Sequence, residues 1–181
     1  DDESLGTGGI QARYAAEGVE TYLITATRGQ RGWFGDEAAY PGPENLGRIR
    51  ERELLSAAEV LGIREVTLLD YMDGELDQAD PVQGVEQLAA HIRRIRPQVV
   101  VTFDPYGYYG HPDHIAISQW TTAAVVAAAS LPALGSLNGR PHRVSKLYYV
   151  AAVREAMESY QAAFGELVMN IDGGERRISP W

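Results

Sequence analysis

The sequence of 181 residues contains no cysteine, no long hydrophobic run and fewer basic than acidic residues. The absence of cysteine excludes disulfides and thiolate metal ligands, so a bound metal would need histidine and carboxylate ligands. No apolar run approaches the roughly 18 residues that a membrane span needs, so we expect no membrane span. Lys and Arg total 16 against 25 Asp and Glu, and the net charge of −9 argues against nucleic acid as a partner.

Length and a hydrophobic content of 45% predict a single domain with one core, spanning residues 1–181. The opening acids run directly into a glycine-rich stretch, as the loop after a first strand does. We therefore expect a first strand upstream of residue 1, and a C-terminal portion beyond the tail at residues 166–181. The expected location is cytoplasmic, and a sequence that starts in such a loop gives no test for a signal peptide.

The most informative stretch is residues 106–114, which ends in Gly110-His-Pro-Asp-His114. It follows the β-branched run 99–103, which predicts a buried strand of the parallel type, and it precedes a helical pattern over residues 115–129. Ligands bind at the carboxyl ends of strands in open α/β sheets. The histidines are therefore candidates for metal binding or catalysis, and the alternative is a solvated loop whose histidines cap a helix.

The two histidines are expected on different backbone segments. If the helix begins near Pro112, His114 projects from its first turn while His111 stays on the loop. Both imidazoles then face one pocket, and Asp113 is close enough to orient a neighbouring ring through its second nitrogen.

Hydrophobic periodicity predicts helices and strands that alternate along the chain. The expected helices cover residues 4–18, 47–61, 82–96, 115–129 and 154–164, and the expected strands cover residues 19–27, 65–69, 99–103, 146–150 and 167–171. This order predicts an α/β fold with a mostly parallel central sheet, helices on both faces and an active site at the C-terminal ends of the strands. Right-handed crossovers would place residues 1–3, residues 28–34, Asp73 and the histidines along one rim.

Other polar or glycine-rich stretches have two interpretations each. The glycines within residues 6–9 allow either close helix packing or the approach of backbone N–H groups to a ligand. The loop at residues 28–45 is either an ordinary surface loop or a functional one in which Trp33 and Phe34 form a substrate wall. The charged residues 48–53 are those of a solvated helix face with ion pairs.

The acids and imidazoles point to metal chemistry. A carboxylate with two imidazoles is a usual ligand set for catalytic Zn²⁺, which keeps an open position for water. Of the adjacent acids Asp1 and Asp2, one can bind the metal while the other accepts a proton from the water, whose pKa falls to about 7. Attack on a carbonyl follows, with an imidazole or phenol stabilising the oxyanion. The alternative is that these acids only stabilise a helix N-terminus.

Four stretches resemble motifs of the PIG-L/LmbE family of zinc-dependent N-deacetylases. The opening Asp1-Asp2-Glu3-Ser4 with Gly8-Gly9 is similar to the end of the family's His-Pro-Asp-Asp-Glu motif, and Gly110-His-Pro-Asp-His114 is similar to its second motif. The two other matching stretches are Arg50-x-x-Glu53-Leu54 leading to Leu61-Gly62, and Asp70-Tyr71-x-Asp73-Gly74. The resemblance runs from residue 1 to about residue 129 and implies a Rossmann-like three-layer sandwich.

The resemblance implies one Zn²⁺ per subunit and a role for each matching residue. Asp2 and His114 would be metal ligands, together with a histidine two positions before Asp1. Asp1 would be the general base, and His111, oriented by Asp113, would be the general acid or oxyanion stabiliser. Fe²⁺ or Co²⁺ would accept the same ligands.

On the substrate side, the resemblance implies that Tyr109 polarises the carbonyl and that Arg50 and Asp73 contact a sugar. Relatives remove acetyl groups from N-acetylglucosaminyl compounds, so the expected partner is a small amino-sugar conjugate and the expected activity is its N-deacetylation. Two alternatives stay open: a zinc amidase that cleaves a larger amide such as a mycothiol conjugate, and a metal-free sugar-binding homologue. A homo-oligomer is compatible with all three.

Overall fold

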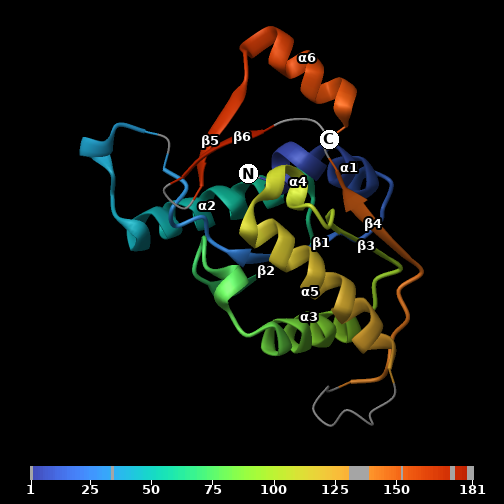
Figure 1. Ribbon diagram of the computed structural model, residues 1–181. Coiled ribbons are helices and arrows are strands. Elements are labelled where there is room, and N and C mark those ends of the chain that lie inside the picture. Colours follow the sequence, from blue (N-terminus) through green and yellow to red (C-terminus); the bar gives the residue numbers. More distant parts are fainter. Residues whose placement is uncertain (1, 34, 131–138, 152, 172–173, 179–181) are drawn as a thin grey trace. The chain divides into compact units, whose positions relative to one another are not determined.

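The computed structural model describes residues 2–33, 35–130, 139–151, 153–171 and 174–178. The chain divides into two compact units, Asp1–Leu76 and Asp77–Trp181, whose elements are labelled in Figure 1. Helices and strands alternate along both units, and the first four strands form two parallel pairs. The predicted α/β class is confirmed. Asp1, Phe34 and residues 131–138, which lie between the helix predicted to end at residue 129 and the strand predicted to begin at residue 146, are outside the described residues.

Unit 1 contains two parallel strands and two long helices. Its elements are α1 (Asp2–Ala16), β1 (Tyr22–Thr27), the short 3₁₀ helix η1 (Glu37–Ala39), α2 (Pro43–Leu61) and β2 (Glu65–Tyr71). Helix α1 packs on α2 at Gly8, where an added Cβ would lie 3.5 Å from the Leu61 side chain. This contact supports the packing interpretation for Gly8, the buried glycine of α1.

Helix α2 begins at Pro43, earlier than the predicted residue 47. Proline suits the first helical turn because its φ is preset and its missing N–H would have no partner there. Gly47 is buried inside the helix, and a Cβ there would lie 3.1 Å from Gln30 Cγ, so the glycine admits the loop after β1. The helix ends as predicted at Gly62, which has a φ of 72°.

Unit 2 carries the histidine stretch. Its first elements are α3 (Pro81–Ile95), β3 (Val99–Phe103), the short turn α4 (Gly107–Gly110), α5 (Pro112–Ala129) and β4 (Lys146–Val150), and the 3₁₀ helix η2 (Leu76–Gln78) precedes them. Strands β3 and β4 are parallel, with Val99 opposite Lys146. Figure 1 shows α5, in gold, lying along α3, in green. The Trp120 ring is 4% exposed and packs where Gly84 leaves no Cβ in its way.

A buried arginine completes the packing of α3 on α5. Arg93 is 4% exposed, and its guanidinium donates to the carbonyls of Ala128 and Ser130 at 3.1 and 2.8 Å. These carbonyls belong to the C-terminal end of α5, where the helix dipole favours a cation. Arg93 therefore holds the far end of the helix that begins at the histidines.

The prediction that the β3 strand is buried is wrong for alternate residues. Val99 and Val101 are 47% and 48% exposed. Helix α5 lies against the pair of strands, where Thr122 Oγ1 and Tyr149 OH are 2.9 Å apart. A β-branched run predicts a strand but does not say how many of its faces are covered.

The last part of unit 2 is helix α6 (Arg154–Phe164), strand β5 (Leu167–Ile171) and strand β6 (Gly174–Ile178). The predicted helix and the predicted strand are both confirmed. The partner of β5 is the antiparallel β6, which the sequence analysis did not predict. Among the residues that the structure describes, no helix has the length and apolar character of a membrane span.

Candidate active site

The histidine loop, residues 104–114, comprises the connection from β3 to α5 and the first residues of α5 in unit 2. The residue before the helix is His111, whose backbone is extended at φ −68° and ψ 129°, and α5 starts at Pro112 as predicted. The His111 Nδ1 atom accepts a hydrogen bond from the Asp113 backbone N–H at 3.1 Å. His111 therefore caps the helix, which was one of the two predicted roles for these histidines.

This cap also determines which proton the His111 ring carries. A neutral imidazole has one donor nitrogen and one acceptor nitrogen. Because Nδ1 is the acceptor, Nε2 carries the proton and is a hydrogen-bond donor. That is the form needed by an oxyanion stabiliser, one of the two roles that the family motif predicts for His111. Asp113 contacts this ring through its backbone amide, and its predicted role in orienting a ring through its carboxylate stays a prediction.

His114 has the opposite tautomer. Its ring is 9% exposed, and its Nδ1 lies 3.3 Å from the Gly107 carbonyl oxygen. A carbonyl oxygen only accepts, so Nδ1 carries the proton and Nε2 carries the lone pair. The Phe103 ring stacks on His114 with centroids 3.9 Å apart and an interplanar angle of 5°. His114 is thus held on two sides, in the tautomer that binds metal through Nε2.

Tyr109 joins the two imidazoles in a three-ring cluster. Its ring centroid lies 5.9 Å from that of His111 and 5.2 Å from that of His114. The two imidazole centroids are 4.8 Å apart. Unit 2 therefore brings together a phenol, a ring N–H and a ring lone pair, and Asp113 of the second predicted motif is buried.

The predicted substrate residues lie in unit 1 and contact one loop. Arg50, on α2, donates through Nη2 to the Gly32 carbonyl oxygen at 2.6 Å. Asp73, just after β2, accepts at Oδ2 from the Arg31 backbone N–H at 2.9 Å. The loop at residues 28–33 and Asp73 thus lie along the same edge of the β1–β2 pair, as the rim prediction requires for this unit.

The sequence analysis missed Arg28 as an organiser of this loop. Arg28 donates to Glu51 at 2.9 Å and also pairs with Asp70, and its side chain is 26% exposed. The hydrogen bond to Glu51 raises the pKa of Arg28, burial lowers it by less, and Asp70 raises it further. The sequence signal was an arginine directly after one strand and an acid at the end of the next.

The described part of the chain tests only a portion of the predicted metal site. Within it, no group of three or more histidine and acidic side chains converges on one point. Asp2 is the exposed first residue of α1 in unit 1, and His114 belongs to unit 2. The fit to a metal therefore rests on the donor chemistry of His114, whose tautomer presents Nε2 as a ligand.

A cavity of about 360 Å³ adjoins the histidine loop within unit 2. Its walls include Gly110 and Pro112 of the loop, Gln119 and Trp120 of α5, and Asp77 of η2. Most of this wall is apolar, with an amide and a carboxylate at its margin. Such a cavity suits a small molecule with an apolar face and a few hydroxyl groups.

Comparison with protein families identifies the chain. The model of the PIG-L family, described as GlcNAc-PI de-N-acetylase, matches residues 1–125. The chain belongs to the PIG-L family. Deacetylases of the PIG-L family are generally metal-dependent, in agreement with the donor chemistry of His114.

Individual PIG-L relatives match most of the chain. A 1D-myo-inositol 2-acetamido-2-deoxy-alpha-D-glucopyranoside deacetylase from Rhodococcus jostii (strain RHA1) is 39% identical over 187 residues, covering 92% of this chain and 63% of the relative. Across eight curated relatives, this chain spans between 43% and 64% of their own length.

Solved structures show the same fold. The conserved protein TT1542 from Thermus thermophilus has a TM-score of 0.68 and 31% identity, covering 90% of this chain and 71% of that chain. The N,N'-diacetylchitobiose deacetylase from Pyrococcus horikoshii has a TM-score of 0.68 and 25% identity, covering 90% and 64%. The Rossmann-like architecture implied by the PIG-L resemblance is therefore confirmed.

Proposed function

We propose that the protein to which this chain belongs is a zinc-dependent hydrolase that removes the N-acetyl group from an N-acetylglucosaminyl-type small-molecule conjugate. The observation that carries the proposal is the pair of complementary imidazoles beside Tyr109: His111 offers an N–H at Nε2, and His114 offers a lone pair at Nε2. Amide hydrolysis needs both functions, one for the developing oxyanion and one for the metal.

In this proposal Asp2 and His114, which match ligand positions of the family motifs, would hold the metal together with a histidine two positions before Asp1. When bound, Zn²⁺ polarises the acetyl carbonyl and supplies a water whose pKa is about 7. Fe²⁺ or Co²⁺ would fit the same nitrogen and oxygen donors.

The chain's own residues carry the proton transfers. Asp1 takes the proton from the attacking water as the water oxygen bonds to the acetyl carbon. His111 Nε2–H and the Tyr109 hydroxyl donate hydrogen bonds to the carbonyl oxygen as it becomes an oxyanion. The C–N bond then breaks, and the proton that Asp1 took passes to the sugar nitrogen. The products are acetate and the amine, which takes up the remaining proton of the water as an ammonium group.

Two named relatives support the substrate class. The Rhodococcus protein is a deacetylase of a 2-acetamido-2-deoxy-glucopyranoside of inositol, and the Pyrococcus protein is a diacetylchitobiose deacetylase. Arg50 and Asp73 are proposed to contact the sugar, because a guanidinium and a carboxylate suit hydroxyl groups. The two compact units are proposed to work as one deacetylase domain, residues 1–181.

The direct test is acetate release from inositol-linked N-acetylglucosamine and from diacetylchitobiose. We expect a chelator to abolish release and Zn²⁺ to restore it, and Asp1→Ala to lose turnover while retaining metal. Full activity in the chelated preparation would reject the metal mechanism. Sugar binding without acetate release and without metal would instead favour a sugar-binding homologue.

A further inference from the structure

A buried carboxylate outside the predicted site lies at the start of the histidine loop. Asp104, directly after β3, is 4% exposed. One of its oxygens, Oδ1, accepts from the Tyr108 backbone N–H at 2.6 Å, and the other, Oδ2, is buried without a hydrogen-bond partner among the described residues. A carboxylate that is buried but only partly satisfied destabilises the fold. Stability therefore does not explain why a carboxylate occupies this position.

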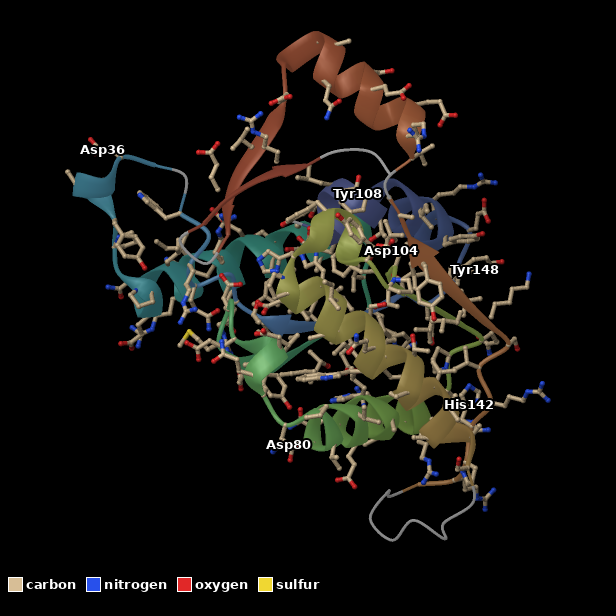
Figure 2. The ribbon with its side chains drawn as sticks, in the orientation of Figure 1. Asp36, Asp80, Asp104, Tyr108, His142 and Tyr148 are labelled. Atoms are coloured by element: carbon tan, nitrogen blue, oxygen red, sulfur yellow. The ribbon has the colours of Figure 1, made fainter. Side chains whose placement is uncertain are left out.

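The group that Asp104 contacts is one end of the peptide bond between Gly107 and Tyr108. The N–H of this peptide points to Asp104 Oδ1. The C=O of the same peptide accepts from His114 Nδ1 at 3.3 Å. A single peptide unit thus connects the carboxylate to the imidazole. Figure 2 labels Asp104 and Tyr108 beside each other at this turn.

The turn is built to hold that peptide in place. Tyr108 has φ 65° and ψ −60°, a rare γ-turn conformation that is strained for a residue with a side chain. Gly107 has φ 73°, and a Cβ there would lie 2.8 Å from Ile115 Cγ1, so only glycine fits. Strain of this kind persists when surrounding contacts hold both ends of the unit, which Asp104 and His114 do.

We infer that Asp104 is a positioning residue for His114 and acts on it through the Gly107–Tyr108 peptide. The carboxylate orients the N–H and polarises the peptide, which strengthens the carbonyl as an acceptor for the His114 Nδ1 proton. This fixes the tautomer and strengthens electron donation at Nε2. Carboxylates commonly contact metal-binding histidines directly, whereas here a backbone amide lies between them. The zinc part of the inference rests on the proposed function, and the tautomer part does not.

The test compares Asp104→Asn with Asp104→Ala in the full chain. Asparagine keeps an acceptor for the Tyr108 N–H but removes the charge, and alanine removes both. The matched control is Asp80→Asn, the same change at the N-cap of α3, where Asp80 accepts from the Val82 N–H and asparagine is an equally good cap. Each variant is checked for folding by circular dichroism.

The first readout is the ¹⁵N NMR spectrum of the His114 ring in metal-free protein at one fixed pH. We expect wild type and Asp80→Asn to show one tautomer, with the proton on Nδ1. Asp104→Asn should show a mixture, and Asp104→Ala a larger share of the other tautomer. A single unchanged tautomer in Asp104→Asn would overturn the inference, and this holds even if Asp104→Ala does not fold.

The second readout is Zn²⁺ affinity, measured by competition with a chromophoric chelator. We expect Asp104→Asn to bind Zn²⁺ about 10-fold more weakly than wild type, at the lower end of the effects of outer-shell changes. Zinc affinity of Asp104→Asn within twofold of wild type would overturn the role of Asp104. A whole wild-type protein that binds no Zn²⁺ would reject the proposed function instead, and the NMR comparison would still decide the role of Asp104.

Discussion

The loop after β1 in unit 1 and the loop after β3 in unit 2 both follow parallel strands, but different interactions hold them. Charged side chains hold the first loop: Arg28 pairs with Glu51 and Asp70, and Arg31 pairs with Glu75. Backbone hydrogen bonds and ring stacking hold the second loop, where Phe103 lies against His114 and the Asp113 N–H bonds to His111.

This difference matches the work proposed for each loop. Exposed ion pairs contribute about 0–1 kcal/mol each and weaken with salt, so they hold a loop loosely enough to exchange partners with a sugar. A proton donor and a metal ligand must stay oriented, which buried packing achieves. The comparison teaches that ion pairs near the surface hold the loop of unit 1, whereas packing and hydrogen bonds preorganise the predicted catalytic groups of unit 2.

The largest expected effect is that of His111→Asn in unit 2. Asparagine is a strong N-cap residue, so it can replace the Nδ1 contact to the Asp113 N–H while removing the Nε2 proton donor. We expect kcat for acetate release to fall about 10²- to 10³-fold, the usual effect of removing one hydrogen-bond donor to an oxyanion. Zn²⁺ binding and the melting temperature should stay close to wild type.

His91→Asn is the control, because His91 lies on α3, with its Nδ1 3.3 Å from Arg94 Nη2. It should leave kcat unchanged. If His111→Asn retained wild-type turnover, His111 would have no role in catalysis and would serve only as the N-cap of α5.

An intermediate effect is expected from Gly84→Ala, which tests the packing beneath the histidine loop. The new Cβ would enter the space of the Trp120 ring, well inside van der Waals contact. We expect a loss of about 1–3 kcal/mol in the free energy of unfolding, measured with denaturant, because the core cannot expand freely. The same change at Gly9, where no atom lies within 4 Å, should stabilise α1 by up to about 1 kcal/mol. Equal effects at the two glycines would contradict the close approach of α3 to α5.

The smallest effect is expected from Arg28→Met in unit 1. Removing the pairs with Glu51 and Asp70 should reduce the free energy of unfolding by about 1 kcal/mol at low salt, and less in 0.5 M salt. Because the pairs raise the pKa of Arg28 above its ordinary value, this stabilisation is fully present below that value and is lost only as pH rises through the raised pKa. The difference between variant and wild type should therefore be constant from about pH 6 to pH 9.

Arg31→Met is the matched comparison on the same loop. The Arg31 and Glu75 side chains are 50% and 45% exposed, so the effect should be about 0.5 kcal/mol or less. If either substitution reduced the free energy of unfolding by the same amount at low and high salt, the unit 1 loop would be held by packing, as the histidine loop is. The two loops would then not differ in the way described above.

Prediction from sequence succeeded where local chemistry decides structure. The start of α5 at Pro112 and the end of α2 at Gly62 follow from backbone preferences of proline and glycine. The strands β3 and β4 follow from β-branched and aromatic runs, and both have the predicted bounds. The start of α2 was missed because Gly47, a poor helix residue, sits inside the helix where the loop after β1 needs room.

The candidate site divides in the same way. The motif at residues 109–114 identified the groups that unit 2 brings together, because they are neighbours along the chain. Asp104 and Arg28 were not predicted as functional positions, since an acid or an arginine beside a strand is common. What distinguishes Arg28 is its pairing with two carboxylates that lie far away along the chain. What distinguishes Asp104 is a peptide that it shares with His114, and only the folded turn brings that peptide between the two side chains.

By itself, the sequence determined the α/β class, most element boundaries and the identity of the reactive groups, because these depend on residue type and short-range spacing. Only the tertiary structure decided which nitrogen of each imidazole carries the proton, which face of β3 is covered and what holds each loop. The reason is physical: a tautomer is set by the hydrogen-bond partner that reaches the ring, and burial is set by the elements that pack against it.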